Sequence, residues 1–189
     1  MNLEGQCQSG FQSSIKNLFF NVEIENDYTT IIKGFRKIKF LKEEPVLKSW
    51  SLFYFSLLDT KENTIKKTYN FKFTVSPIEK LKLDFGHIKI GVLESKKKKK
   101  LHDISWIISF NEEFKANLYF DNLIRLFTPL SSKYSLKPEI NLPDCRIAKF
   151  SSMLDEKNLI HGITFILSHN EFNKVYEIQL MIFNDLADL

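Results

Sequence analysis

The chain has 189 residues, of which 43% are hydrophobic and 18 are phenylalanine, against 6 glycines and 5 prolines. This composition supplies enough apolar surface for a core and excludes extended disorder, and the length suits one domain, which we place at residues 15–189 behind a flexible segment at 1–14. The net charge is +4, and no stretch approaches the run of about 18 apolar residues that a membrane span needs. Because there is no secretory signal pattern and the two cysteines give no disulfide framework, we expect an intracellular protein.

Most of the chain alternates between apolar and polar residues with a period of two, and β-branched and aromatic residues fill the apolar positions, as in β-strands. This pattern predicts strands at residues 18–24, 31–41, 50–58, 69–75, 81–93 and 104–110. In the strand at 69–75 the aromatic residues share one face, and Lys72 and Thr74 lie on the other. Gly86 and Gly91 mark a bulge or a bend in the strand at 81–93.

The apolar spacing becomes helical between Phe114 and Phe127, which predicts one main amphipathic helix that ends before Pro129. Residues 129–144 are expected to form a crossing loop, and three antiparallel strands are predicted after it, at 147–154, 159–167 and 175–183. About eight to ten strands and one main helix indicate a mainly β fold, an antiparallel sandwich, jelly-roll-like domain or open barrel.

Basic residues are concentrated in the middle of the chain. Residues 61–101 hold 12 lysines against 4 acidic residues, a balance of +8, whereas residues 139–189 hold 4 basic and 8 acidic residues. The five lysines at 96–100 are expected in a solvated turn between two strands, where they aid solubility, direct nuclear import or contact phosphate groups. The predicted phosphate-binding residues are Lys66, Lys67, Lys72, Lys82, Lys89, Lys96, Lys97, Lys98, Lys99 and Lys100. Lysine favours the phosphate backbone over bases, so the expected partner is single-stranded nucleic acid such as RNA, or an anionic membrane surface.

Aromatic residues are interleaved with this charge at Tyr69, Phe71, Phe73 and Phe85. On an open sheet face they would stack with unpaired bases. The alternative, which the alternating pattern favours, is that they face the core. The two tryptophans are also expected in the core.

No arrangement of residues predicts an enzyme. Motifs for phosphate loops, nucleophile elbows and dinucleotide binding do not occur, and no cofactor or metal is expected. A site assembled from Cys145, His161 and His169 is conceivable, although zinc sites usually have closely spaced ligand pairs. His102 and Asp103 could be a base and its orienting carboxylate, but an exposed loop pair fits the pattern better.

Asp59 directly follows the most hydrophobic predicted strand, where the ordinary role of an aspartate is to open a turn. The stretches around it are Ser51–Lys61, Tyr69–Pro77, Leu81–Leu93 and Ile104–Phe110. Over residues 50–110 they resemble the core of plant-virus movement proteins of the thirty-kilodalton superfamily, with Asp59 at the hallmark aspartate and Pro77 at the strand-ending proline. The resemblance implies a jelly-roll-like protein that binds single-stranded nucleic acid without sequence preference and moves viral genomes between cells. The lysine run is not part of that pattern.

A second stretch, Asn17–Glu25, is similar to the first strand of rhabdovirus matrix proteins. This resemblance implies a self-associating structural adaptor that bridges nucleocapsid and membrane. A non-viral protein-interaction module, in which the lysine run only aids solubility, is the third hypothesis.

Overall fold

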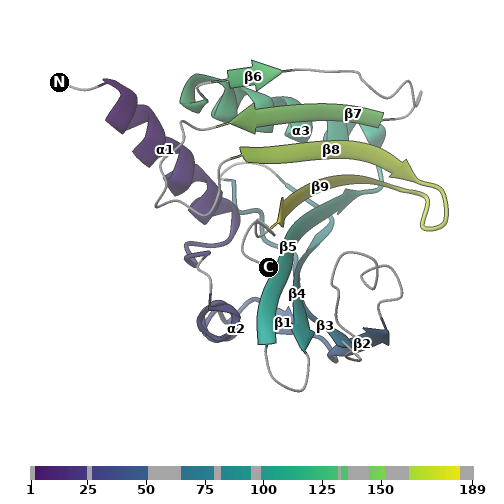
Figure 1. Ribbon diagram of the computed structural model, residues 1–189. Helices are drawn as coiled ribbons and strands as arrows, with labels where there is room; N and C mark the ends of the chain where they lie inside the picture. Colours follow the sequence, from purple (N-terminus) through teal and green to yellow (C-terminus); the bar gives the residue numbers. More distant parts are fainter. Residues whose placement is uncertain are drawn as a thin grey trace.

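The structure is a computed structural model that describes residues 3–24, 27–50, 65–78, 82–94, 99–131, 133–135, 145–151 and 162–183. Its helices are α1 (Leu3–Leu18), α2 (Tyr28–Arg36), α3 (Glu113–Phe127) and the 3-10 turn η2 (Thr128–Leu130). Its strands are β1 (Lys42–Glu43), β2 (Leu47–Trp50), β3 (Ile65–Phe73), β4 (Phe85–Glu94), β5 (Lys99–Phe110), β6 (Lys133–Ser135), β7 (Cys145–Ser151), β8 (Gly162–Asn170) and β9 (Val175–Phe183). Figure 1 shows how these elements are arranged.

All the described strands belong to one antiparallel sheet with the order β1-β3-β4-β5-β9-β8-β7-β6, and β2 pairs with β3 beyond the end of β1. The sheet has two halves of similar organisation, because α2 precedes the meander β3–β4–β5 and α3 precedes the meander β7–β8–β9. The halves join where β5 pairs with β9, from Asp103 opposite Phe183 to Phe110 opposite Tyr176. The strands of the two halves run in different directions across this junction (Figure 1).

The hydrophobic core lies between one face of the sheet and the helices. We call this the inner face and the opposite one the outer face. Alternate residues of the strands point inward, which is why the apolar positions repeat every second residue. The buried inner-face side chains of the central strands are Phe71, Phe73, Ile88, Ile90, Val92, Ile104, Trp106, Ile108 and Phe110. The helices complete the core from the other side, with Phe11 from α1, Phe35 from α2 and Phe127 from α3.

The mainly β fold class, its antiparallel pairing and the presence of a helix near 114–127 are confirmed. The helix predicted at 114–127 is α3, and the strands predicted in the second half are β7, β8 and β9. The predicted irregularity is present at Gly91, because the register of β4 with β5 shifts between Gly91 and Val92 and leaves His102 of β5 as the extra residue. The layer that faces the sheet is built from helices rather than from a second sheet within the described ranges.

Two predicted strands are wrong. Residues 31–41 begin inside α2, and residues 18–24 contain the end of α1 and a turn in which Phe20 and Asn21 have φ values of 54° and 64°. Residues 3–14, expected to be flexible, lie in α1. The reason is burial on one helix face, since Phe11, Ile15 and residues 18 and 19 are spaced for a helix and are at most 1% exposed. Tertiary burial of this kind overrides the strand preference of β-branched and aromatic residues.

Several predictions fall on residues outside the described ranges. These are most of the strand at 50–58 with Asp59, the first three lysines of the run at 96–100, and most of the crossing loop at 129–144. Within that loop the structure describes η2 and β6.

Asp27 caps the first turn of α2. Its carboxylate accepts hydrogen bonds from the backbone N–H of Thr29 at 3.0 Å and from the Thr30 hydroxyl at 2.7 Å. The bond from the Thr30 hydroxyl, with those from Thr29, lowers the pKa of Asp27 to about 2. Because the folded pKa lies below the unfolded value of about 4, the stabilisation is complete above about pH 4 and is lost as the pH falls toward 2.

We therefore expect Asp27→Ala to lower the melting temperature at pH 7, because the cap's acceptor is lost. The difference from the unchanged protein should narrow as the pH falls from 4 toward 2. Melting curves followed by circular dichroism at a series of pH values measure this. Asp27→Asn is the matched control, since its side-chain oxygen still caps the helix but does not titrate. A deficit of Asp27→Ala that is the same at pH 7 and at the lowest pH would contradict the assignment.

Candidate functional site

The sheet divides the predicted basic band between its two faces. Lys66, Lys72 and Lys89 lie on the outer face of β3 and β4, whereas Lys67, near the start of β3, points to the inner face. Lys82 is exposed ahead of β4. The β4–β5 pairing extends to Glu94 opposite Lys99, so the lysine run joins two strands of a hairpin, as predicted. Lys99 and Lys100 belong to β5 rather than to the turn. Lys96, Lys97, Lys98 and Asp59 lie outside the described residues.

Acidic side chains neutralise part of the band. Glu94 binds both Lys67 and Lys99, the latter at 2.7 Å, and these hydrogen bonds, that of Lys67 first, lower the pKa of Glu94 to about 2. On the other face, the ammonium group of Lys66 lies 2.6 Å from Asp103 Oδ1. This ion pair crosses above Gly91, where a side chain would collide with it. Among the described residues of the band, three lysines are therefore paired with acidic side chains and are not free to bind an anion.

His102 and Asp103 are not an exposed loop pair, and that prediction is wrong. Both belong to β5, at the bulge, and His102 is only 6% exposed. Burial is the main cause that lowers the pKa of His102. Asp103 is used by the ion pair with Lys66.

The lysines of the band that make no ion pair with a described residue lie nearer the edge of the sheet formed by β1. Lys42 of β1 stands directly opposite Lys72 of β3, and Lys72 stands directly opposite His87 of β4. Residues paired in this way share a face of the sheet. Lys89 lies two positions from His87 on the same face. We call these four residues the Lys42–Lys72 surface.

None of the three lysines on this surface makes an ion pair within the part of the chain that the structure describes. Like charges directly opposite each other in an antiparallel pair are destabilising. Lys42 and Lys72 therefore form a position at which a bound anion would relieve repulsion. Sequence reasoning named Lys72 and Lys89 but missed Lys42, because the register of β1 against β3 is set by the fold and leaves no local signal.

An aromatic ring lies within this surface. The ammonium group of Lys72 is 5.6 Å from the centre of the Phe85 ring, which in turn meets the His87 ring edge-on at 5.9 Å. Phe85 is half-buried on the outer face. By contrast, Phe71 and Phe73 are each 1% exposed, which confirms that they belong to the core.

His87 is oriented by a short hydrogen-bonded chain. Its Nδ1 lies 3.2 Å from the side-chain oxygen of Asn70, and the Asn70 amide donates to the Glu44 carboxylate. Burial is the largest cause of a lowered pKa at His87; the charge of Glu44 opposes this shift, and Lys89 and Lys72 add to it. His87 is therefore mainly neutral at pH 7, and the lysines supply the charge of the surface.

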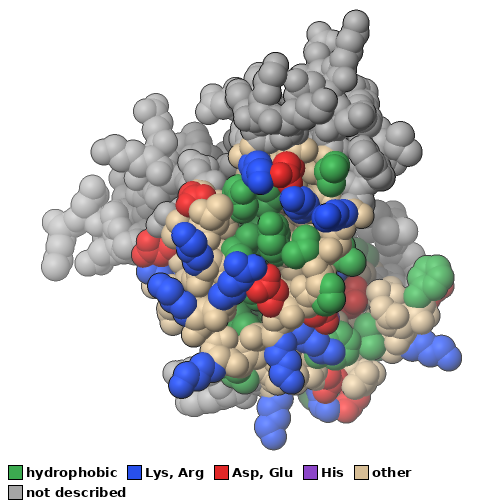
Figure 2. Space-filling model, turned by 90° about the horizontal axis from the view of Figure 1, so that it is seen from below, with side chains coloured by type: hydrophobic (Ala, Val, Ile, Leu, Met, Phe, Trp, Pro, Cys, Tyr) green, Lys and Arg blue, Asp and Glu red, His purple; other side chains and the backbone are tan. Residues whose placement is uncertain are grey.

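Further basic side chains lie at the end of the molecule that carries α2, β1 and β2. Seen from that end, lysine and arginine side chains surround an area of hydrophobic side chains (Figure 2). Lys33, Lys37 and Lys39 are exposed on α2 and the turn after it. Arg36, also on α2, is held by Glu43 of β1 at 2.7 Å. Sequence analysis did not find this arrangement, because it predicted a strand rather than a helix at 31–41.

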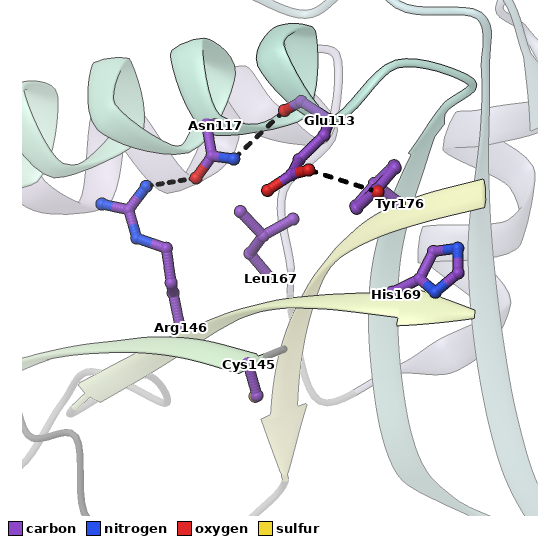
Figure 3. A pocket seen from close by; sticks show the side chains of 7 residues that line it. All are labelled: Glu113, Asn117, Cys145, Arg146, Leu167, His169 and Tyr176. Atoms are coloured by element: carbon purple, nitrogen blue, oxygen red, sulfur yellow. Dashed lines mark hydrogen bonds between the residues drawn. The ribbon is translucent and has the colours of Figure 1, made fainter. Parts of the chain in front are cut away.

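Cys145 and His169 line one pocket, which Glu113, Asn117, Arg146, Leu167 and Tyr176 complete. Figure 3 shows that the Cys145 side chain leaves β7 on the side away from Arg146 and does not point at His169. His161 lies outside the described residues. The described part of the chain brings no three histidine, cysteine or acidic side chains together in a metal-binding arrangement.

Comparison with protein-family models, with curated proteins and with solved structures found no match to this chain. The likenesses to movement proteins and to matrix proteins therefore stay predictions. Among the described helices, none has both the length and the apolar character that a bilayer crossing requires.

Proposed function

We propose that this protein binds single-stranded nucleic acid, without sequence preference, through the Lys42–Lys72 surface. The observation that carries the proposal is the opposed pair of lysines on β1 and β3, neither of which makes an ion pair within the described residues. Neighbouring strands are about 4.8 Å apart, so both ammonium groups can reach the same phosphate. Lys89 extends the charge along the next strand.

The chemistry of the surface favours a single strand over other anionic partners. Lysine contributes a point charge that suits phosphates but lacks the paired donors with which arginine reads guanine. Phe85 places an aromatic ring among the lysines, and unpaired bases stack on such rings whatever their identity. The proposed activity is binding rather than catalysis. It is also the activity that the likeness to movement proteins implies, and the partner we propose is intracellular RNA.

The expected result is binding of a uniform single-stranded RNA that weakens steeply with salt. For single strands, the logarithm of the affinity falls by about 0.7 for each phosphate contact per unit of log salt, so changing Lys42, Lys72 and Lys89 to glutamine should reduce this slope by up to about 2. Fluorescence anisotropy across a salt series measures it. The matched control changes Lys115, Lys149 and Lys174, which are exposed on other elements, and removes the same charge.

An equal loss of slope in both triple variants would show that net charge alone governs binding, and would contradict the proposal. So would an absence of binding at low salt. A preference for anionic vesicles over RNA would assign the same lysines to a membrane surface. Protein dimers that form only on vesicles would favour the hypothesis of a self-associating structural adaptor.

A further inference from the structure

The inner face carries a pocket in the other half of the sheet, far along the strand order from the Lys42–Lys72 surface. It has a volume of about 220 Å³ and lies between the first turns of α3 and the ends of β7, β8 and β9. Figure 3 shows Glu113 and Asn117 reaching down from α3, while Arg146, Leu167, His169 and Tyr176 come from the strands.

Of the two charged side chains that line this pocket, one has a partner of opposite charge among the described residues and the other does not. The guanidinium group of Arg146 donates to Asn117 Oδ1 at 2.6 Å and to Asp121 Oδ1 at 2.7 Å, and it lies 4.8 Å from the centre of the Phe120 ring. Asp121 therefore balances Arg146. The carboxylate of Glu113 has no cation beside it among the described residues. Its polar contact within the pocket is a long hydrogen bond of 3.4 Å from the Tyr176 hydroxyl.

The Tyr176 ring lies next to this carboxylate, and the His169 ring lies next to the Tyr176 ring. His169 and Tyr176 are directly opposite each other in β8 and β9, and their ring centres are 4.8 Å apart at an angle of 37°. Aromatic rings attract organic cations through the negative charge of their faces. A carboxylate next to such rings supplies an ion pair to the same guest.

We propose that this pocket binds a small organic cation, an ammonium or guanidinium head group. The charge of Glu113 and the ring of Tyr176 would hold it, and His169, stacked against Tyr176, lines the pocket beside them. The volume is below the range of about 300–1,000 Å³ typical of sites for whole drug-sized ligands. A head group with a short chain therefore fits better than a larger molecule. The head group belongs either to a free amine or to a basic side chain of another protein.

The test titrates the full-length protein with butylammonium, tetramethylammonium and guanidinium chlorides, followed by amide chemical shifts. We expect saturable shifts at residues lining the pocket, and none there with sodium acetate. Glu113→Gln should weaken the binding about fivefold, the factor for a partly exposed ion pair. The matched control is Glu112→Gln, one residue earlier and paired with Lys115 rather than facing the pocket.

Tyrosine variants separate the ring from its hydroxyl. Tyr176→Phe should keep the binding, whereas Tyr176→Leu should weaken it. Equal affinity of Glu113→Gln and the unchanged protein, equal losses in both glutamate variants, or no shifts with any of the three cations would each overturn the proposal. A blocked lysine tripeptide that binds more tightly than butylammonium would identify a protein side chain as the guest, and equal affinity would identify a free amine. RNA binding by Glu113→Gln should be unchanged, because the two sites share no residue.

Discussion

Replacing Phe127 by alanine is expected to lower the free energy of unfolding by about 3–5 kcal/mol, the cost of removing a fully buried phenyl ring. Phe127 is 0% exposed at the end of α3. Its ring centre lies 5.7 Å from that of Phe11, 5.8 Å from that of Phe150 and 5.3 Å from that of Phe165. It therefore connects α1, α3, β7 and β8, and no single neighbour can move to fill the cavity.

Equilibrium unfolding in urea measures this change, because the loss of free energy of unfolding lowers the urea concentration at the midpoint of unfolding. The control is Phe172→Ala in the turn between β8 and β9, where the ring is 99% exposed and its removal should change the free energy of unfolding by less than about 0.5 kcal/mol. If the two variants were equally stable, α1 and α3 would not be packed as described. If Phe127→Ala destabilised α1 alone and left the rest of the protein as stable as before, the Phe127 ring would pack only against that helix.

The second large effect is expected at Gly91, which leaves room for the ion pair between Lys66 and Asp103. A Cβ atom at this position would overlap Asp103 Oδ1 and stand 2.8 Å from Cε of Lys66. Gly91→Ala should therefore lower the free energy of unfolding by about 1–3 kcal/mol, as overpacking does. The φ angle of Gly91 is not in the left-handed region, so the backbone itself accepts alanine.

The sign of the change should depend on residue 103. In an Asp103→Ala background the overlapping oxygen is gone, and Lys66 can turn away because its end is flexible. Gly91→Ala should then be neutral or should stabilise by up to about 1 kcal/mol, since alanine loses less backbone entropy than glycine on folding. Urea unfolding of the four proteins gives the coupling energy. A cost for Gly91→Ala that is equal in both backgrounds would exclude the ion pair as its cause.

Sequence periodicity predicted the sheet better than the helices. In β3 the alternation of aromatic residues with Lys72 directly reflects which side faces the core, and Gly91 of β4 marked the shift in register against β5, whereas Gly86 pairs regularly. Each of these signals is local. The pairing of β5 with β9, which makes one sheet of the two halves, depends on residues far apart in the chain and has no local signal.

The helix α2 was missed because a short segment rich in Phe, Ile and Thr satisfies both periods. In α2 the residues Ile31, Ile32 and Phe35 are helically spaced, and Asp27 is a capping residue at the expected place. These two signals together could have found the helix. The β-branched residues favoured a strand instead. The packing of Phe35 against Phe71 of β3, which the sequence does not reveal, favours the helix.

The candidate surface was predicted only in part, because a sequence gives the number of charges but not their partners. Lys66, Lys67 and Lys99 count toward a basic band, yet each is paired with an acidic side chain. Lys42 contributes to a neutral-looking first third of the chain, yet it stands against Lys72. The pocket beside α3 joins residues 113 and 176, and no spacing rule connects them.

The junction of β5 with β9 also has a consequence for biosynthesis. While the ribosome is still making the second half, the meander β3–β4–β5 already has its own hairpins and its own helices, but the open edge of β5 has no strand to pair with. An unpaired edge rich in Ile and Trp is a template for pairing with other nascent chains. The edge is closed only when β9 emerges, so slow translation of the second half should favour aggregation, and a chaperone that covers β5 should improve the yield.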